Sequence, residues 1–251
     1  MKKITDKILD KKYFIFDIDG TLVDSMGMWN LVDQATIFNQ TGIEVPVEDI
    51  KMLRDSVLYS ENNIGGDIYD IFYQEVVKTF GMNLTSEQYG MLRRELADYI
   101  SINELDFKSG AAEFLQILKI LGKKIGITTT TTRRQFEIYS KHNEKMVKQA
   151  PMEDLASAII TCEDVKRKKP DPEAYLKTVE KLGAKKKDCI VFEDSLSGAI
   201  AAKSAGLDVI SVYDESARFE QDRLGMVADY KIESFDELIK ILGLESYNQK
   251  Q

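Results

Sequence analysis

The pattern that most constrains this chain is the alternation, from residue 107 onward, of short apolar runs with segments of helical period. The apolar runs have the length of strands: KKIGITT (123–129), SAIITC (157–162), DCIVFED (188–194) and LDVISVY (207–213). Helix-length segments separate them, among them GAAEFLQILKILG (110–122), a long polar segment through 149, PEAYLKTVEKLG (172–183) and SLSGAIAAKSAG (195–206). Such alternation is typical of right-handed β-α-β units, which give a parallel sheet covered by helices on both faces. We therefore predict an α/β fold, to which YFIFD (13–17) contributes an earlier strand.

Residues 24–106 have a different pattern. Helical period dominates this block, with no convincing strand between the segments MWNLVDQATIFNQTG (28–42), IYDIFYQEVVKTFG (68–81) and SEQYGMLRRELADYI (86–100). The pair Gly65-Gly66 predicts a break inside the block. We expect an α/β core domain formed by 1–23 and 107–251, interrupted by a helical domain at 24–106.

The charge balance argues against two classes of partner. The 251 residues include 34 basic and 42 acidic side chains, a net charge of -8, which weakens any general attraction to nucleic acid or to an anionic membrane.

There is no N-terminal signal and no apolar run near about 18 residues, the length of a membrane span. The two cysteines, Cys162 and Cys189, lie far apart in or beside apolar runs, which favours reduced core thiols over a disulfide. We expect a soluble, cytoplasmic protein.

Acidic pairs follow two of the predicted strands. Asp17 and Asp19 come after the first strand, and Glu193 and Asp194 end a later one. Single acids there could serve a turn with Gly20 or cap the helix that follows. However, the carboxyl ends of parallel strands meet at one crevice, and neighbouring carboxylates raise each other's pKa unless a cation neutralises them. The pairs therefore indicate a metal site or a shared proton, and a hard cation such as Mg²⁺ prefers these oxygen ligands.

Two further segments offer groups that bind anions. In KRKKPDP, Lys169 precedes Pro170, which favours an extended backbone at the lysine, while Lys168 remains a rival by one position. The run Thr128–Thr132 ends a predicted strand and supplies hydroxyl and backbone donors at the start of a helix, although β-branched residues also favour strands for structural reasons. His142, the only histidine, is expected to be an exposed helix residue.

The order of these motifs resembles that of the haloacid dehalogenase superfamily. The sequence DIDGTLVDS resembles its first motif, and a threonine at the end of the next strand, the lysine of KKPDP and the acids of FEDS resemble the other three. The resemblance covers nearly all of 13–213 and implies a Rossmann-like sheet with an inserted cap. Helices inserted directly after the first strand are similar to the cap of the β-phosphoglucomutase and phosphoglycolate-phosphatase branch.

The resemblance also implies a role for each motif residue. Asp17 would be the nucleophile that forms an aspartyl-phosphate, and Asp19 would protonate the leaving oxygen and later take a proton from water. Lys169 would neutralise Asp17 and the phosphate, with Thr129 as hydroxyl donor and Thr130 as backbone donor. The ligands of Mg²⁺ would be the side chains of Asp17 and Asp194 and the backbone carbonyl of Asp19, with Glu193 as a second-choice ligand.

Haloacid dehalogenases proper lack an acid at the position of Asp19, so its presence favours phosphoryl transfer over cleavage of a carbon–halogen bond. We therefore predict an Mg²⁺-dependent phosphatase that acts on a small phosphorylated metabolite. The alternatives are a hexose phosphomutase and a non-catalytic binding protein on the same scaffold. Arg54 is placed like the cap arginine that holds a second phosphate in sugar phosphomutases, but the glycine expected near it is missing, which favours the hydrolase.

Overall fold

A computed structural model describes residues 2–58 and 68–250 of the chain. The chain divides into two compact units, one formed by Met1–Ser25 with Leu105–Gln251 and the other by Met26–Glu104. Each unit is described by itself below. The predicted break at Gly65-Gly66 lies outside the described residues.

The first unit contains a parallel sheet of six strands in the order β3-β2-β1-β4-β5-β6. The strands are β1 (Tyr13–Phe16), β2 (Lys124–Thr128), β3 (Ala156–Ile160), β4 (Cys189–Glu193), β5 (Asp208–Val212) and β6 (Tyr230–Ile232). This topology confirms the predicted α/β fold, and each of the five predicted strands is present within two residues of its expected bounds. The sixth strand, β6, was not anticipated from the sequence.

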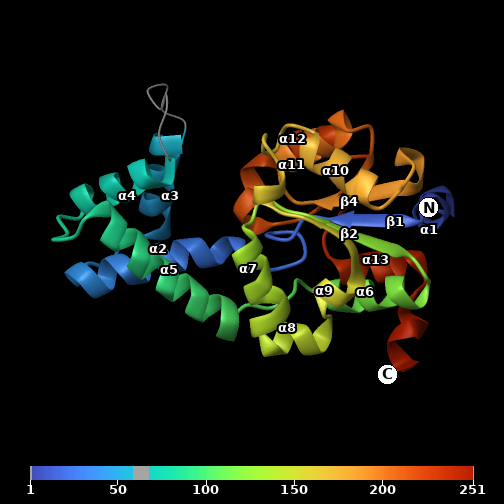
Figure 1. The fold of residues 1–251 in the computed structure, drawn as a ribbon, viewed down its shortest axis with the longest axis horizontal. Helices are drawn as coiled ribbons and strands as arrows, with labels where there is room; N and C mark the ends of the chain where they lie inside the picture. Colours follow the sequence, from blue (N-terminus) through green and yellow to red (C-terminus); the bar gives the residue numbers. More distant parts are fainter. Residues whose placement is uncertain (1, 59–67, 251) are drawn as a thin grey trace. The chain divides into compact units, whose positions relative to one another are not determined.

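Helices cover both faces of this sheet (Figure 1). Figure 1 shows α10, α11 and α12 on one face and α6 and α13 on the other. The α-helices of this unit are α1 (Lys2–Leu9), α6 (Ala111–Ile120), α7 (Arg133–Glu137), α8 (Glu144–Gln149), α9 (Met152–Leu155), α10 (Glu173–Lys181), α11 (Leu196–Ser204), α12 (Gln221–Val227) and α13 (Phe235–Leu242). Short 3-10 helices span Cys162–Asp164, Lys186–Asp188, Glu215–Glu220 and Glu245–Lys250.

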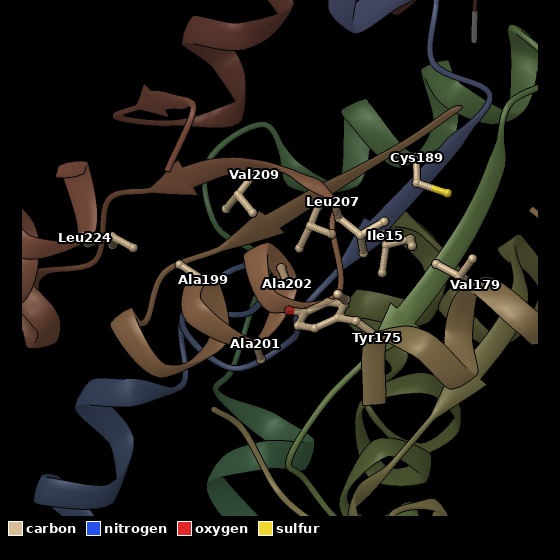
Figure 2. Packing of buried hydrophobic residues seen from close by; sticks show 12 residues of the cluster. Ile15, Tyr175, Val179, Cys189, Ala199, Ala201, Ala202, Leu207, Val209 and Leu224 are labelled. Atoms are coloured by element: carbon tan, nitrogen blue, oxygen red, sulfur yellow. The ribbon is translucent and has the colours of Figure 1, made fainter. Parts of the chain in front are cut away.

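The central strand β1 divides the core into two parts, because successive strand residues point to opposite faces. On one face, Phe14 and Phe16 pack with aromatic rings of β4, α6 and α13, at centroid distances between 4.7 and 6.3 Å: Phe192, Phe114 and Phe235. On the other face, Ile15 packs with Tyr175 of α10 and with the small residues of α11 (Figure 2). By the same alternation, the residue after Phe16, Asp17, lies on the face of the sheet that α10 and α11 cover.

The segment between β2 and β3 is not the single long helix that the sequence suggested. It forms α7, then a π-helix at Ile138–His142, then α8. Asn143 causes the interruption, because its N–H donates to the carbonyl of Ile138 while its side chain accepts from the N–H of Met146 and so caps α8. His142 is exposed, as expected.

Two antiparallel segments of the first unit lie beside each other where the second unit is inserted. Val23 forms a β-bridge with Phe107, and the N–H of Lys108 donates to the carbonyl of Leu22 at 2.8 Å. One residue further, the N–H of Asp24 donates to the carbonyl of Asp106 at 3.1 Å. Both ends of the insertion are thus anchored to each other by backbone hydrogen bonds.

The second unit consists of helices: α2 (Met26–Thr41), α3 (Val47–Leu58), α4 (Ile68–Thr79) and α5 (Ser86–Asn103). Its core holds a fully buried carboxylate, Asp33 of α2. Asp33 accepts hydrogen bonds from Tyr89 at 2.8 Å and from Arg93 at 2.6 Å, both on α5, and from Arg54 of α3 at 2.6 Å. Arg54 also donates to the side chain of Asn30 at 2.9 Å. The guanidinium of Arg54 is therefore bound within its own unit.

None of the helices that the structure describes is long and apolar enough to cross a membrane.

The aromatic face of the sheet leads to a prediction about stability. Phe114 is fully buried and contacts four other rings, so Phe114→Ala should lower the free energy of unfolding by about 3–5 kcal/mol. The matched control is Phe219→Ala, because Phe219 is 82% exposed and its removal should cost less than about 0.5 kcal/mol. Urea unfolding followed by circular dichroism measures both, and equal effects of the two variants would contradict the assignment of Phe114 to the core.

Candidate active site

Asp17 directly follows β1 and is 7% exposed. Its N–H still donates to the carbonyl of Phe192 on β4 at 3.0 Å, so the backbone at Asp17 stays in register with the neighbouring strand. The chain then turns at Gly20, which has a φ of 82° and whose carbonyl accepts a hydrogen bond from Lys108 at 2.9 Å. The turn places Asp17 and Asp19 at the carboxyl ends of the central strands, where the sequence predicted a site.

Lys169 reaches this edge of the sheet from the loop before α10. Its ammonium lies 2.7 Å from Oδ1 of Asp17 and 2.5 Å from Oε1 of Glu193, and it also donates to the carbonyl of Thr128 at 3.1 Å. Burial alone would lower the pKa of Lys169, but Asp17 and then Glu193 outweigh this and hold the pKa above its usual value. Lys168 is exposed. Of the two candidate lysines, the structure brings Lys169 to the carboxylates.

Glu193 is fully buried and both of its carboxylate oxygens already accept hydrogen bonds. Oε1 accepts from Lys169 and from the hydroxyl of Tyr175 at 2.7 Å, and Oε2 accepts from the N–H and the hydroxyl of Ser195 at 3.2 and 3.0 Å. Gly198 gives this side chain its space, because a Cβ at that position would lie 1.8 Å from Oε1. The surroundings of Glu193 are those of an anchor for Lys169.

Asp194, Asp17 and Glu193 form an acidic cluster whose nearest carboxylate oxygens all lie within 4.8 Å of one another. Asp194 is 3% exposed and accepts a hydrogen bond from the hydroxyl of Thr21 at 2.7 Å, but no described residue forms an ion pair with it. Three carboxylates therefore share one ammonium. Such a buried excess of negative charge, built from oxygen donors, fits a divalent cation of the hard type.

The pKa values of the cluster reflect the same excess of charge. Burial raises the pKa of Asp17 to about 7, since the attraction of Lys169 offsets only part of the desolvation and Glu193 repels the charged form. Burial and then the charges of Glu193 and Asp17 raise the pKa of Asp194 well above its usual value. Both carboxylates would ionise more readily if a cation were added beside them.

Asp19 is surrounded by hydroxyl groups instead of charges. Oδ1 accepts hydrogen bonds from Ser25 at 2.6 Å and from Tyr139 at 2.9 Å, and Oδ2 accepts one from Thr131. Burial, followed by the charge of Asp19, raises the pKa of Tyr139 well above its usual value, so this phenol stays protonated and donates. Asp19 is thus held in one orientation from both of its oxygens.

The predicted phosphate-binding threonines follow β2. Thr129 is buried, its N–H donates to the carbonyl of Ile160, and its hydroxyl accepts from the N–H of Thr131 at 3.0 Å. Thr130 is exposed. Their neighbour Thr128 touches Lys169 through its carbonyl, which locates the threonine segment at the same strand ends as Asp17. The hydroxyl that reaches Asp19, however, belongs to Thr131.

Sequence reasoning missed several hydroxyl groups that contact the predicted residues. Thr21 and Ser25 lie in the first motif itself, and attention to its hydroxyls could have found them. Tyr139 and Tyr175 are buried on elements far away in sequence, and no local pattern indicates that their hydroxyls point toward carboxylates. Thr131 belongs to the threonine run that the sequence singled out, but its contact with a carboxylate was not predicted.

Comparisons with known proteins identify the relatives of this chain. A model of the haloacid dehalogenase-like hydrolases matches residues 11–206. The protein YhcW of Bacillus subtilis is 30% identical over 242 residues, which cover 95% of this chain and 99% of YhcW. Hexitol phosphatase B of Escherichia coli is 27% identical over 89% of this chain and 92% of its own length.

Among solved structures, CbbY from Rhodobacter sphaeroides in complex with phosphate has the same fold, with a TM-score of 0.65 at 23% identity over 91% of this chain and 96% of CbbY. The family match confirms the resemblance that the four motifs indicated. This chain belongs to the family of haloacid dehalogenase-like hydrolases.

Proposed function

We propose that this protein is a phosphatase that transfers the phosphoryl group of a small phosphorylated metabolite to Asp17 and then to water. The observation that carries the proposal is the buried ammonium of Lys169 between Asp17 and Glu193, beside Asp194, at the carboxyl ends of β1 and β4. Glu193 binds the ammonium and Asp194 is available to a cation, while Asp17 lies at the carboxyl ends of the strands, where ligands of open α/β sheets bind. Relatives that act on phosphate esters, such as hexitol phosphatase B, support the assignment.

Asp17 is proposed as the nucleophile. Lys169 binds Oδ1, and no described residue donates a hydrogen bond to Oδ2, which is therefore available to attack phosphorus. The new bond joins Oδ2 to phosphorus while the bond from phosphorus to the ester oxygen breaks. Lys169 reduces the repulsion between the carboxylate and the incoming phosphate, and the hydroxyl of Thr129 and the N–H of Thr130 are the proposed donors to its oxygens.

Asp19 is the proposed proton carrier. In the first step it gives a proton to the ester oxygen, which leaves as an alcohol. In the second step it takes a proton from the water that attacks the aspartyl-phosphate, which releases inorganic phosphate and restores Asp17. Each half of the reaction therefore returns Asp19 to the protonation state that the other half needs.

The side chains of Asp17 and Asp194 and the backbone carbonyl of Asp19 are the proposed ligands of Mg²⁺. Bound there, Mg²⁺ would supply positive charge that offsets the carboxylates and the phosphate oxygens. Glu193 is assigned the role of orienting Lys169, and any contact with the metal would pass through water, because Lys169, Tyr175 and Ser195 already occupy its two oxygens.

The substrate class is proposed from two observations. Relatives of this chain include a hexitol phosphatase, and a structure of similar fold contains xylulose bisphosphate, so sugar and sugar-alcohol phosphates are the first compounds to test. We infer that the helical unit 26–104 is the cap that selects among them. Asp33 and Asn30 hold Arg54, which favours a hydrolase of monophosphates over a phosphomutase that must bind a bisphosphate.

A panel of phosphate esters tests the proposed function. Wild-type protein with Mg²⁺ should release inorganic phosphate from at least one ester among sorbitol 6-phosphate, glucose 1-phosphate, glucose 6-phosphate and p-nitrophenyl phosphate. Asp17→Asn should remove this activity, because the amide cannot attack phosphorus, whereas Asp10→Asn, an exposed residue before β1, should keep it.

Each other result of the panel has a meaning. Conversion of glucose 1-phosphate to glucose 6-phosphate without release of phosphate would establish a phosphomutase instead. Absence of any turnover would favour the non-catalytic binding protein, and full activity of Asp17→Asn would overturn the role of Asp17.

The neighbouring lysines provide a matched pair of variants. Lys169→Ala should lower kcat/KM by at least about a hundredfold, since it removes the charge that stabilises the transferring group. It should also destabilise the protein by about 3–5 kcal/mol, because two buried carboxylates lose their partner. Lys168→Ala should resemble wild type in both respects. Kinetics and thermal unfolding measure the pair, and equal effects would show that the side chain at 169 has no special role.

The acidic cluster predicts how metal binding depends on pH. The pKa of Asp17 is raised to about 7 in the folded protein, so the stability that its proton contributes is present below its unfolded pKa and is lost as pH rises through about 7. The melting temperature of metal-free protein should therefore fall as pH rises from 5 to 8, less so in Asp17→Asn. Mg²⁺ binds the ionised form, so its stabilising effect in the same thermal assay should be larger at pH 8 than at pH 6.

The control for this measurement is Asp194→Asn, which should respond far less to Mg²⁺ at either pH, whereas Asp10→Asn should respond as wild type does. A stabilisation by Mg²⁺ that does not change with pH or with the loss of Asp194 would place the metal elsewhere.

A further inference from the structure

The hydroxyl groups around Asp19 assign a role to a tyrosine that no motif contains. We propose that Tyr139 is a positioning residue that fixes the carboxyl group of Asp19 for proton transfer to the leaving oxygen. This inference rests on the proposed function, because it concerns the proton carrier of that reaction. It adds a specific claim, namely that the benefit of Tyr139 is confined to substrates whose leaving group needs a proton.

The contacts of Tyr139 are those of a rigid support. The residue is fully buried, and its hydroxyl donates to Oδ1 of Asp19 at 2.9 Å. It lies in the π-helix that Asn143 terminates, and the side-chain amide of Asn143 is itself fixed by a hydrogen bond to the carbonyl of Leu105 at 2.9 Å. An aromatic side chain has only two rotatable bonds, so a buried tyrosine holds its hydroxyl in place at little cost in entropy.

The donors are distributed unequally between the two oxygens of Asp19. Tyr139 and Ser25 both donate to Oδ1, whereas Oδ2 contacts only the hydroxyl of Thr131 among the described residues. A hydroxyl can accept as well as donate, so Thr131 tolerates a proton on Oδ2 by turning. Oδ1 is occupied by two donors, which leaves Oδ2 as the atom that exchanges the proton with the leaving oxygen.

The expected consequence follows from the chemistry of the leaving group. An alkoxide is a poor leaving group, so an alkyl phosphate needs the proton of Asp19 while its bond to phosphorus breaks. The p-nitrophenolate ion leaves without a proton. Loss of the hydroxyl of Tyr139 leaves Ser25 as the one described donor to Oδ1 and so loosens the carboxyl group, which should slow the first reaction and hardly affect the second. Tyr139 keeps its own proton throughout.

The test compares kcat/KM of Tyr139→Phe with that of wild type for p-nitrophenyl phosphate and for the alkyl phosphate that wild type hydrolyses fastest in the panel. The ratio kcat/KM reports only the steps through phosphoryl transfer to Asp17, so a slow second step does not mask the effect. We expect a loss of about tenfold to a hundredfold for the alkyl ester and less than about threefold for p-nitrophenyl phosphate. Thr131→Val, which removes the donor to the other oxygen, should show the same preference.

Tyr175→Phe is the matched control, because Tyr175 is equally buried and donates to Glu193 instead of Asp19. Its losses should be similar for the two esters. Equal losses for the two esters in Tyr139→Phe, or no loss for the alkyl ester, would overturn the positioning role while the proposed function stands. If wild type hydrolyses none of the esters, the proposed function fails and the role of Tyr139 fails with it.

Discussion

The site depends on one buried cation. The ammonium of Lys169 lies within hydrogen-bond distance of Asp17, Glu193 and a backbone carbonyl of β2, so a single charge connects the ends of three strands or the residues directly after them. Removing ions from water is costly, and the cost is recovered only when the geometry and the remaining hydrogen bonds are good. For Glu193, Tyr175 and Ser195 supply these hydrogen bonds, and the lack of a side chain at Gly198 gives the carboxylate its room. The packing of α10 and α11 on the sheet therefore also holds the ammonium of Lys169 in position.

The sequence predicted most of the sheet because strands buried on both faces have a strong local signal. Runs such as IGI and IVF are apolar and are bounded by segments of clear helical period, so a parallel arrangement of their strands follows from general rules. Weaker signals were missed. β6 has only three residues, and α1 precedes the first motif in a stretch that contains more charged than apolar side chains. The interruption at Asn143 was also missed. In a polar segment, an asparagine that caps a helix has the same local sequence pattern as one that does not.

The candidate site was partly readable for a different reason. Its carboxylates stand at strand ends or shortly after them, and parallel strands bring these ends together whatever the length of chain between them. Their supporting hydroxyls could not be read in this way. Tyr139 and Thr131 reach Asp19 across 120 and 112 positions of sequence, and the contact depends on the phase of a π-helix that only the folded chain reveals. The sequence likewise could not distinguish a metal ligand from an anchor at Glu193, since both are buried acids after a strand.

The backbone pairing of Val23 with Phe107 joins the two ends of the insertion and keeps the candidate site within the first unit. All the contacts of the candidate site described above arise from residues up to Ser25 or from Leu105 onward, and the two segments that lead to the insertion are hydrogen-bonded to each other within that same unit. The insertion therefore begins and ends at adjacent points, as a loop tip does, and tolerance to insertion is greatest at such points. The charged groups of the first unit and the helices at 26–104, which we propose as the cap, can thus change independently in evolution: substitutions in the proposed cap leave the contacts among these charges in place.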